Sequence, residues 1–162
     1  HPDVGALHAA LKQKDQYEIE MKQAIYFTKS PEAYNLIITH QLPSASNYSS
    51  KLFQRLRRSG VPMLTIIGQN VHIPSFNRAN LGIQIQSQRM QLNESFPVIN
   101  NDFDKFQIAE DFINLLPTLP PLHSPFGKYK SAEHVFPIVL QKLGRVQTNY
   151  PLAAVPLLNY LV

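Results

Sequence analysis

The chain has 162 residues, of which 44% are hydrophobic, and this is enough for one domain with a buried core. Only 16% are charged and the net charge is +4, without the basic, aromatic-rich stripe that nucleic-acid binding requires. The absence of cysteine excludes disulfides, thiolate nucleophiles and cysteine metal sites. We therefore expect a single domain over residues 1–162, with no cofactor, no metal ion and no nucleic-acid partner.

The N-terminal residues predict a helix followed by a strand. His1-Pro2-Asp3 suits a first helical turn, because proline is preorganised there and aspartate favours the helix dipole. The helix should end near Lys14, and its apolar face repeats at helical spacing in Val4, Leu7, His8 and Leu11. Tyr17–Met21 alternates and predicts a strand near a sheet edge. Since an α/β domain that opens on a helix is unusual, we also expect a strand just upstream of His1.

Residues 31–70 predict one parallel βαβ unit. Tyr34–His40 and Val61–Ile67 are continuous apolar runs, which are typical of strands buried on both faces of a parallel sheet. Between them, Ser49–Ser59 predicts a helix with Leu52, Phe53 and Leu56 facing inward. Its basic residues are interpreted as a solvated outer face. The spacing fits a right-handed crossover through that helix.

Beyond Asn70 the pattern is less regular. Gly82–Gln86 predicts an outer strand, and Glu110–Leu116 predicts a short helix. Pro117–Pro125 holds four prolines and is expected to be irregular. Val135–Leu140 and Val146–Thr148 predict a β-hairpin. Taken with the βαβ unit, the sequence predicts an α/β fold of flavodoxin-like topology, with a mostly parallel sheet flanked by helices and an irregular C-terminal β part.

The candidate site is a crevice at the carboxyl ends of the parallel strands, where α/β proteins usually bind ligands. His40 ends the first strand, and the backbone amides after the second strand can bind an anion. The helix start should lie at the mouth of the neighbouring turn. The predicted binding crevice therefore comprises His1, Asp3, His40, Ser44, Gly68 and Gln69.

Known catalytic and cofactor motifs are missing from the sequence. It contains neither the G-x-S-x-G nucleophile elbow nor the H-E-x-x-H zinc motif, and the glycine-rich dinucleotide fingerprint is absent. These observations favour binding over catalysis. The alternative is a hydrolase with a relocated site formed by Ser44, His40 and Asp3, which requires the Ser44 hydroxyl to lie within about 2.6–3.2 Å of a histidine nitrogen.

Two segments resemble the class I glutamine amidotransferase-like fold. In that family an oxyanion turn follows one strand, and a second strand has the form P-x-x-G-x-C-x-G-x-Q. Pro62, Gly68 and Gln69 resemble the frame of the second motif, but Ile67 lies near the position of the catalytic cysteine. His40–Pro43 replaces the oxyanion turn. The resemblance therefore implies a non-catalytic relative.

Four segments are more specifically similar to the amidotransferase-like domain of Bacteroidetes membrane proteins of the Bacteroides aerotolerance (BatA) type: His1–Asp3, Tyr34–Ser44, Pro120–Tyr129 and Gln141–Leu152. The function of that family is largely uncharacterised. The resemblance implies a fragment of a larger, membrane-anchored protein of the cell envelope, joined to the membrane through flanking segments. Other domains of the same chain or other envelope proteins would be its partners.

Overall fold

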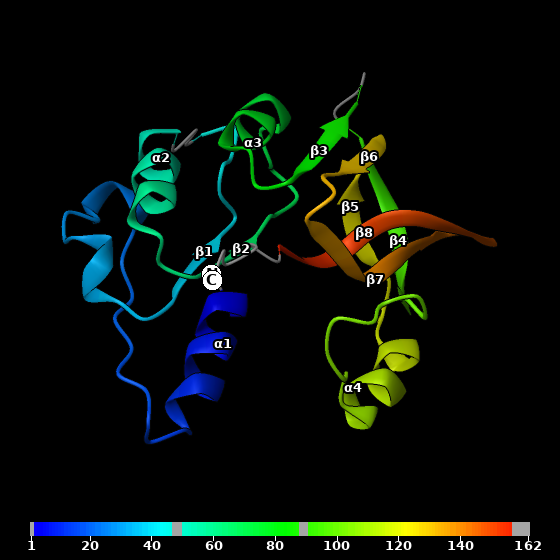
Figure 1. Cartoon of the computed structure of the whole chain (residues 1–162), viewed down its shortest axis with the longest axis horizontal. Helices are drawn as coiled ribbons and strands as arrows, with labels where there is room; N and C mark the ends of the chain where they lie inside the picture. The colour runs from blue at the N-terminus through cyan, green and yellow to red at the C-terminus, as the bar shows by residue number, and fades with distance from the viewer. Residues whose placement is uncertain (1, 47–49, 88–90, 157–162) are drawn as a thin grey trace.

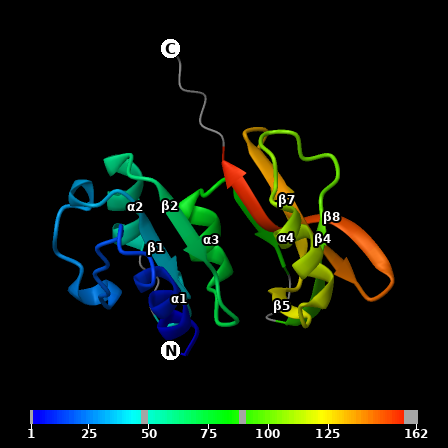
Figure 2. The ribbon, with the colours of Figure 1, turned by 90° about the horizontal axis from the view of Figure 1, so that it is seen from below.

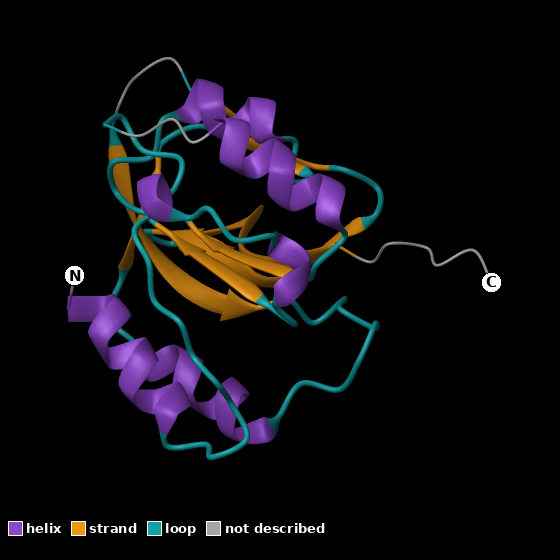
Figure 3. Ribbon diagram, turned by 90° about the vertical axis from the view of Figure 1, so that its left-hand side faces the viewer, coloured by secondary structure: helices purple, strands orange, loops and turns teal. Residues whose placement is uncertain are grey.

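The computed structural model describes residues 2–46, 50–87 and 91–156 (Figure 1). The N-terminal half contains a parallel strand pair and three helices, α1 (Pro2–Lys12), α2 (Ser50–Ser59) and α3 (Ile73–Ala79), and antiparallel strands dominate the C-terminal half. Figure 3 shows the strands between a group of helices above and a second group below, which includes α1 at the N-terminus. No helix within the described residues is long and apolar enough to cross a membrane.

The predicted βαβ unit is confirmed. Strand β1 (Ile37–His40) and strand β2 (Met63–Ile66) pair in parallel, with Ile37 opposite Met63, and α2 (Ser50–Ser59) connects them. The inward face of α2 is buried at Phe53 and Leu56, while its basic residues are exposed as predicted. The strands themselves are only half-buried, and Thr39 is the one residue of either strand that is fully buried.

The helix at the N-terminus is confirmed as α1 (Pro2–Lys12), but the strand predicted after it is not formed. Tyr17–Met21 has no assigned secondary structure and joins no ladder in the described part of the chain. The only regular structure between α1 and β1 is two 3-10 turns, η1 (Ala24–Tyr26) and η2 (Pro31–Ala33). The parallel sheet therefore consists of two strands among the described residues.

The predicted fold class is wrong, because most of the described strands are antiparallel and curl into a half-barrel (Figure 2). The larger sheet has the order β5-β4-β7-β8. Its strands are β4 (Leu92–Ile99), β5 (Leu122–Pro125), β7 (Val135–Leu143) and β8 (Val146–Pro156). A second antiparallel pair is formed by β3 (Ile83–Gln86) and β6 (Lys128–Ser131). A flavodoxin-like parallel sheet flanked by helices is therefore excluded for this structure.

The predicted hairpin is confirmed as β7 and β8, and proline explains why the sequence does not predict β4. A proline lacks the amide that a strand ladder needs, so a proline inside an apolar run argues against a central strand. In this structure Pro97, Pro137 and Pro151 nevertheless lie inside β4, β7 and β8, each opposite a residue of the neighbouring strand. The β7–β8 ladder shifts register after Pro137, whereas the β4–β7 ladder runs past Pro97 in continuous register. The segment predicted as irregular likewise ends in strand β5.

Two short helices connect the strands. Helix α3 (Ile73–Ala79) follows β2, and its Phe76 packs with Val71 and Ile85 in a hydrophobic cluster that joins the two halves. Helix α4 (Glu110–Leu115) confirms the predicted short helix and continues into the 3-10 turn η3 (Leu116–Thr118). The contact between α3 and β3 positions the half-barrel against the βαβ unit.

The half-barrel encloses a buried polar network centred on Gln141, which is 1% exposed. Its side-chain carbonyl accepts hydrogen bonds from Ser95 at 3.2 Å and from Ser124 at 3.0 Å. The two hydroxyl oxygens are 2.5 Å apart, and the Gln141 amide donates to the Pro151 carbonyl at 3.1 Å. Nearby, burial is the main cause that raises the pKa of Tyr129 to about 12. These polar groups are satisfied internally and are not open to a ligand.

Candidate functional site

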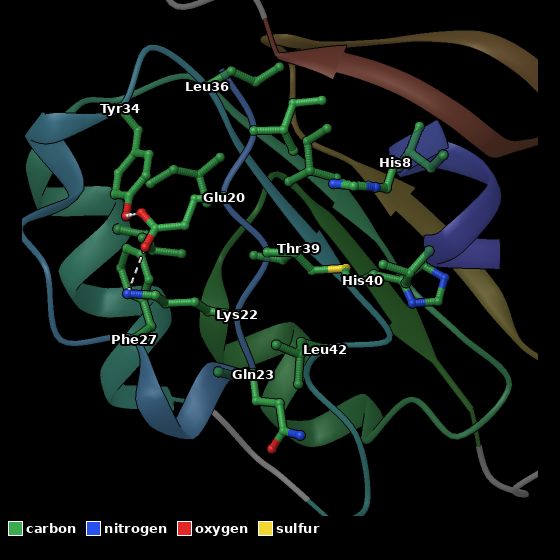
Figure 4. Close-up of a pocket in the computed structure, with 18 of the residues that line it drawn as sticks. His8, Glu20, Lys22, Gln23, Phe27, Tyr34, Leu36, Thr39, His40 and Leu42 are labelled. Carbon is green, nitrogen blue, oxygen red and sulfur yellow. Dashed lines mark hydrogen bonds and ion pairs between the residues drawn. The ribbon is translucent and has the colours of Figure 1, made fainter. Parts of the chain in front are cut away.

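A groove of about 430 Å³ lies beside β1, and we name it the α1–β1 groove (Figure 4). Its first wall is the apolar face of α1, on which four side chains are half-buried while the other described residues of the helix are mostly exposed. These are the side chains predicted to repeat at helical spacing: Val4, Leu7, His8 and Leu11. They stay half-buried because they border the groove and not a filled core.

The other walls come from three further segments. Leu52 and Leu56 of α2 line the groove, and α2 lies on the opposite side of β1 from α1 (Figure 1). The extended residues 19–23 and residues 36–40, which include β1, also line the groove. The groove is therefore bounded by two helices and by two extended segments of chain.

A charged cluster holds the extended segment in place. The carboxylate of Glu20 accepts a hydrogen bond from the Tyr34 hydroxyl at 2.5 Å and pairs with Lys22 at 2.7 Å (Figure 4). It also accepts a hydrogen bond from Lys29 at 2.9 Å. Lys22, then Tyr34 and Lys29, lower the pKa of Glu20 to about 2. Because Tyr34 lies shortly before β1, these contacts tie the extended segment to the start of the strand.

A second set of contacts anchors the same region to α2. The Arg55 guanidinium donates to the Phe27 carbonyl at 2.6 Å and lies 4.9 Å from the centre of the Phe27 ring. The rings of Phe27 and Tyr34 are 5.8 Å apart. The side of the groove opposite α1 is thus fixed by side-chain contacts, although residues 17–23 join no sheet.

Strand β1 presents one edge to β2 and the other edge to the groove. The amide of Ile37 donates to Pro62 at 3.0 Å, and the amide of Gln41 donates to Ile66 at 2.8 Å. In a parallel ladder, alternate residues face the same neighbour. The amide and carbonyl of Ile38 therefore point away from β2, toward the groove side, and the described residues supply no partner for them.

The structure brings several of the predicted site residues together. The carboxyl ends of β1 and β2 lie side by side, and Gln41 takes a left-handed conformation directly after His40. Its side chain contacts Gly68 so closely that an added Cβ there would lie 2.7 Å from the Gln41 Cγ. Ser44 forms an isolated bridge with Val71, close to the exposed Gln69. Of this group, only His40 also lines the groove.

Two predicted residues cannot be placed fully. His1 lies outside the described residues, and Asp3 belongs to α1 but its side chain is not described. The Ser44 hydroxyl is 3.2 Å from that of Ser46. The relocated Ser44–His40–Asp3 hydrolase site therefore stays a prediction.

A serine–histidine pair that the sequence did not indicate occurs at the start of α3. The His72 Nδ1 atom is 2.8 Å from the Ser75 hydroxyl, which also accepts a hydrogen bond from Arg78 at 3.2 Å. Ser75 is 2% exposed, so its hydroxyl is closed to a substrate. We interpret this pair as structural, because it ties the first turn of α3 to its own end.

Sequence reasoning missed most of the groove. Glu20, Tyr34 and Leu36 belong to no sequence motif. The sequence feature that pointed to this region is the alternation of Tyr17–Met21, which follows a helix with an apolar face. Within the described part of the chain, no group of three or more histidine, aspartate and glutamate side chains can hold a metal ion. The described lining offers a ligand apolar side-chain contacts and the backbone amide and carbonyl of Ile38.

Comparison of the chain with protein-family models, with curated proteins and with solved structures found no match.

Proposed function

We propose that this protein is a non-catalytic binding domain and that its ligand or partner occupies the α1–β1 groove. The observation that carries the proposal is the groove itself, with a volume within the range of about 300–1,000 Å³ typical of ligand sites. Its walls are mainly apolar side chains from α1, α2 and the start of β1. Burial of these surfaces by a ligand would supply the free energy of binding.

The position of the groove supports the proposal in a second way. His40 stands at the carboxyl end of β1 and lines the groove, so the groove shares this residue with the crevice that the sequence predicts as the binding site. The envelope setting, with partners from the same protein or from other envelope proteins, remains a prediction from the resemblance to BatA-type proteins.

The experiment is a titration with the uncharged apolar dye Nile red, whose fluorescence rises in apolar surroundings. A matched pair of variants locates the dye. Leu36→Glu places a carboxylate in the groove wall, while Leu64→Glu changes a leucine of similar exposure on β2 outside the groove; the two side chains are 52% and 48% exposed. Because both residues are exposed, both variants should fold.

We expect Leu36→Glu to weaken dye binding about tenfold, which corresponds to about 1.4 kcal/mol of lost apolar contact. Leu64→Glu should bind the dye as the wild type does. Equal loss in both variants, or no loss in Leu36→Glu, would contradict the proposed site.

A further inference from the structure

We propose that the occupant of the α1–β1 groove is an extended polypeptide segment of a partner, which pairs with the backbone of Ile38 on the groove side of β1. The proposal rests on the proposed function and names the partner chemistry for the same site. Addition of a strand to an open sheet edge is a common mode of peptide recognition, in which backbone hydrogen bonds supply affinity and side-chain pockets supply selectivity.

The first argument is the backbone of β1. Ile38 directs its amide and carbonyl away from β2, and the described residues give them no partner. Backbone polar groups that become buried must be hydrogen-bonded, or burial costs free energy. A purely apolar small molecule would cover these groups without pairing them. A peptide strand covers the groove and pairs with the same groups.

The second argument is the shape of the site. Extended chain lines the groove at residues 19–23 and 36–40, so the groove runs alongside strand β1. Helices α1 and α2 cover opposite sides of β1 (Figure 1). An inserted strand would therefore meet apolar side chains on both of its faces. Strands buried on both faces are rich in valine, isoleucine and leucine, and this defines the composition of the expected segment.

The third argument is charge. Glu20 is the only carboxylate among the described residues that line the groove, and Lys22 and Lys29 both pair with it. Its low pKa keeps it ionised and paired at neutral pH. The site therefore presents no unpaired carboxylate that would select a cationic ligand. An uncharged, apolar strand is electrostatically complementary to this lining.

The fourth argument is continuity with the existing sheet. The β1–β2 ladder already sets the direction and spacing of strands, and a third strand on β1 would extend that interface. Among the described residues, β1 has β2 as its neighbour on one edge and no strand on the groove side.

The test uses an acetylated and amidated synthetic peptide with the central run Val-Ile-Leu-Ile-Val and one uncharged glutamine at each end. The control peptide has the same side chains but carries N-methyl groups on its central amides, which removes the hydrogen-bond donors. Binding to the full chain is measured by calorimetry. Amide hydrogen exchange by NMR then follows Ile38 and, as the internal control, Thr65, whose backbone faces the outer edge of β2.

We expect the peptide to slow exchange of the Ile38 amide at least tenfold, with Thr65 unchanged and the methylated control inactive. Leu36→Glu should weaken the peptide about tenfold, and Leu64→Glu should not. Protection of Thr65 without Ile38, or equal binding of the methylated control, would overturn the inference. If Nile red enters the groove and the peptide does not bind, the strand inference fails while the proposed function stands. If neither binds there, both fail.

Discussion

Replacement of Gln141 by methionine tests the polar network inside the half-barrel. Methionine is close to glutamine in volume, so it removes the amide group without leaving a large cavity. The side chain of Gln141 is 1% exposed and bonds to Ser95, Ser124 and Pro151. Gln141→Met should therefore act through hydrogen bonds that are lost in a buried site.

The magnitude follows from the donors and acceptors that lose partners. With the Gln141 carbonyl gone, one serine hydroxyl can still donate to the other, because their oxygens are 2.5 Å apart. The second hydroxyl proton then has no acceptor, and the Pro151 carbonyl loses the Gln141 amide. Each unsatisfied buried group costs about 1–3 kcal/mol. We expect a loss of about 2–4 kcal/mol in the free energy of unfolding, and a melting temperature lower by about 5–15 °C.

The assay is urea denaturation followed by circular dichroism, with the triple variant Ser95→Ala, Ser124→Ala, Gln141→Met as the partner experiment. Removal of both hydroxyls together with the amide eliminates the unpaired donor, so the triple variant should be more stable than Gln141→Met alone. A loss below about 0.5 kcal/mol for Gln141→Met, or a triple variant that is less stable than the single one, would refute the reasoning.

Two further predictions concern local interactions. Calorimetry should show that Glu20→Gln lowers the melting temperature at pH 7 but not near pH 2. The lowered pKa of Glu20 contributes stability above the ordinary value of 4.5, and this contribution is lost as the pH falls through about 2. An equal effect at both pH values would contradict the Glu20 cluster. Gly82→Ala should lower the free energy of unfolding far more than Gly144→Ala. Both glycines have a positive φ, but only at Gly82 would an added Cβ lie 2.3 Å from the Val135 side chain. Equal unfolding free energies of the two variants would exclude that close approach.

The part of the fold that the sequence predicts is the part whose signals are local. The β1–α2–β2 unit combines two apolar runs with one amphipathic helix, and its order follows from the chain alone. The face of α1 is equally clear at helical spacing. The sequence also predicts the hairpin of β7 and β8, although Pro137 lies inside β7. In β4, Pro97 interrupts the apolar pattern, and the sequence does not predict this strand.

The candidate site shows the same limit. His40 is predictable because it ends a buried strand, and it does line the groove. Tyr17–Met21 is predicted as a strand because its apolar and polar residues alternate. This alternation indicates which side chains share a face, but it does not indicate whether another strand lies close enough to form backbone hydrogen bonds. In the structure, Glu20 is tied to Tyr34 while the segment around it joins no ladder. The groove forms because this segment pairs with no strand among the described residues, and the sequence pattern does not indicate whether a segment pairs.

The most direct measurement uses the methionines as built-in probes. Met21 lines the groove, whereas Met63 on β2 does not. With carbon-13-labelled methionine methyl groups, assigned through Met21→Leu and Met63→Leu, addition of the Val-Ile-Leu-Ile-Val peptide should shift the Met21 signal and leave the Met63 signal in place. A shift of Met63 alone, or no shift of Met21 at saturating peptide, would contradict binding of a strand in the α1–β1 groove.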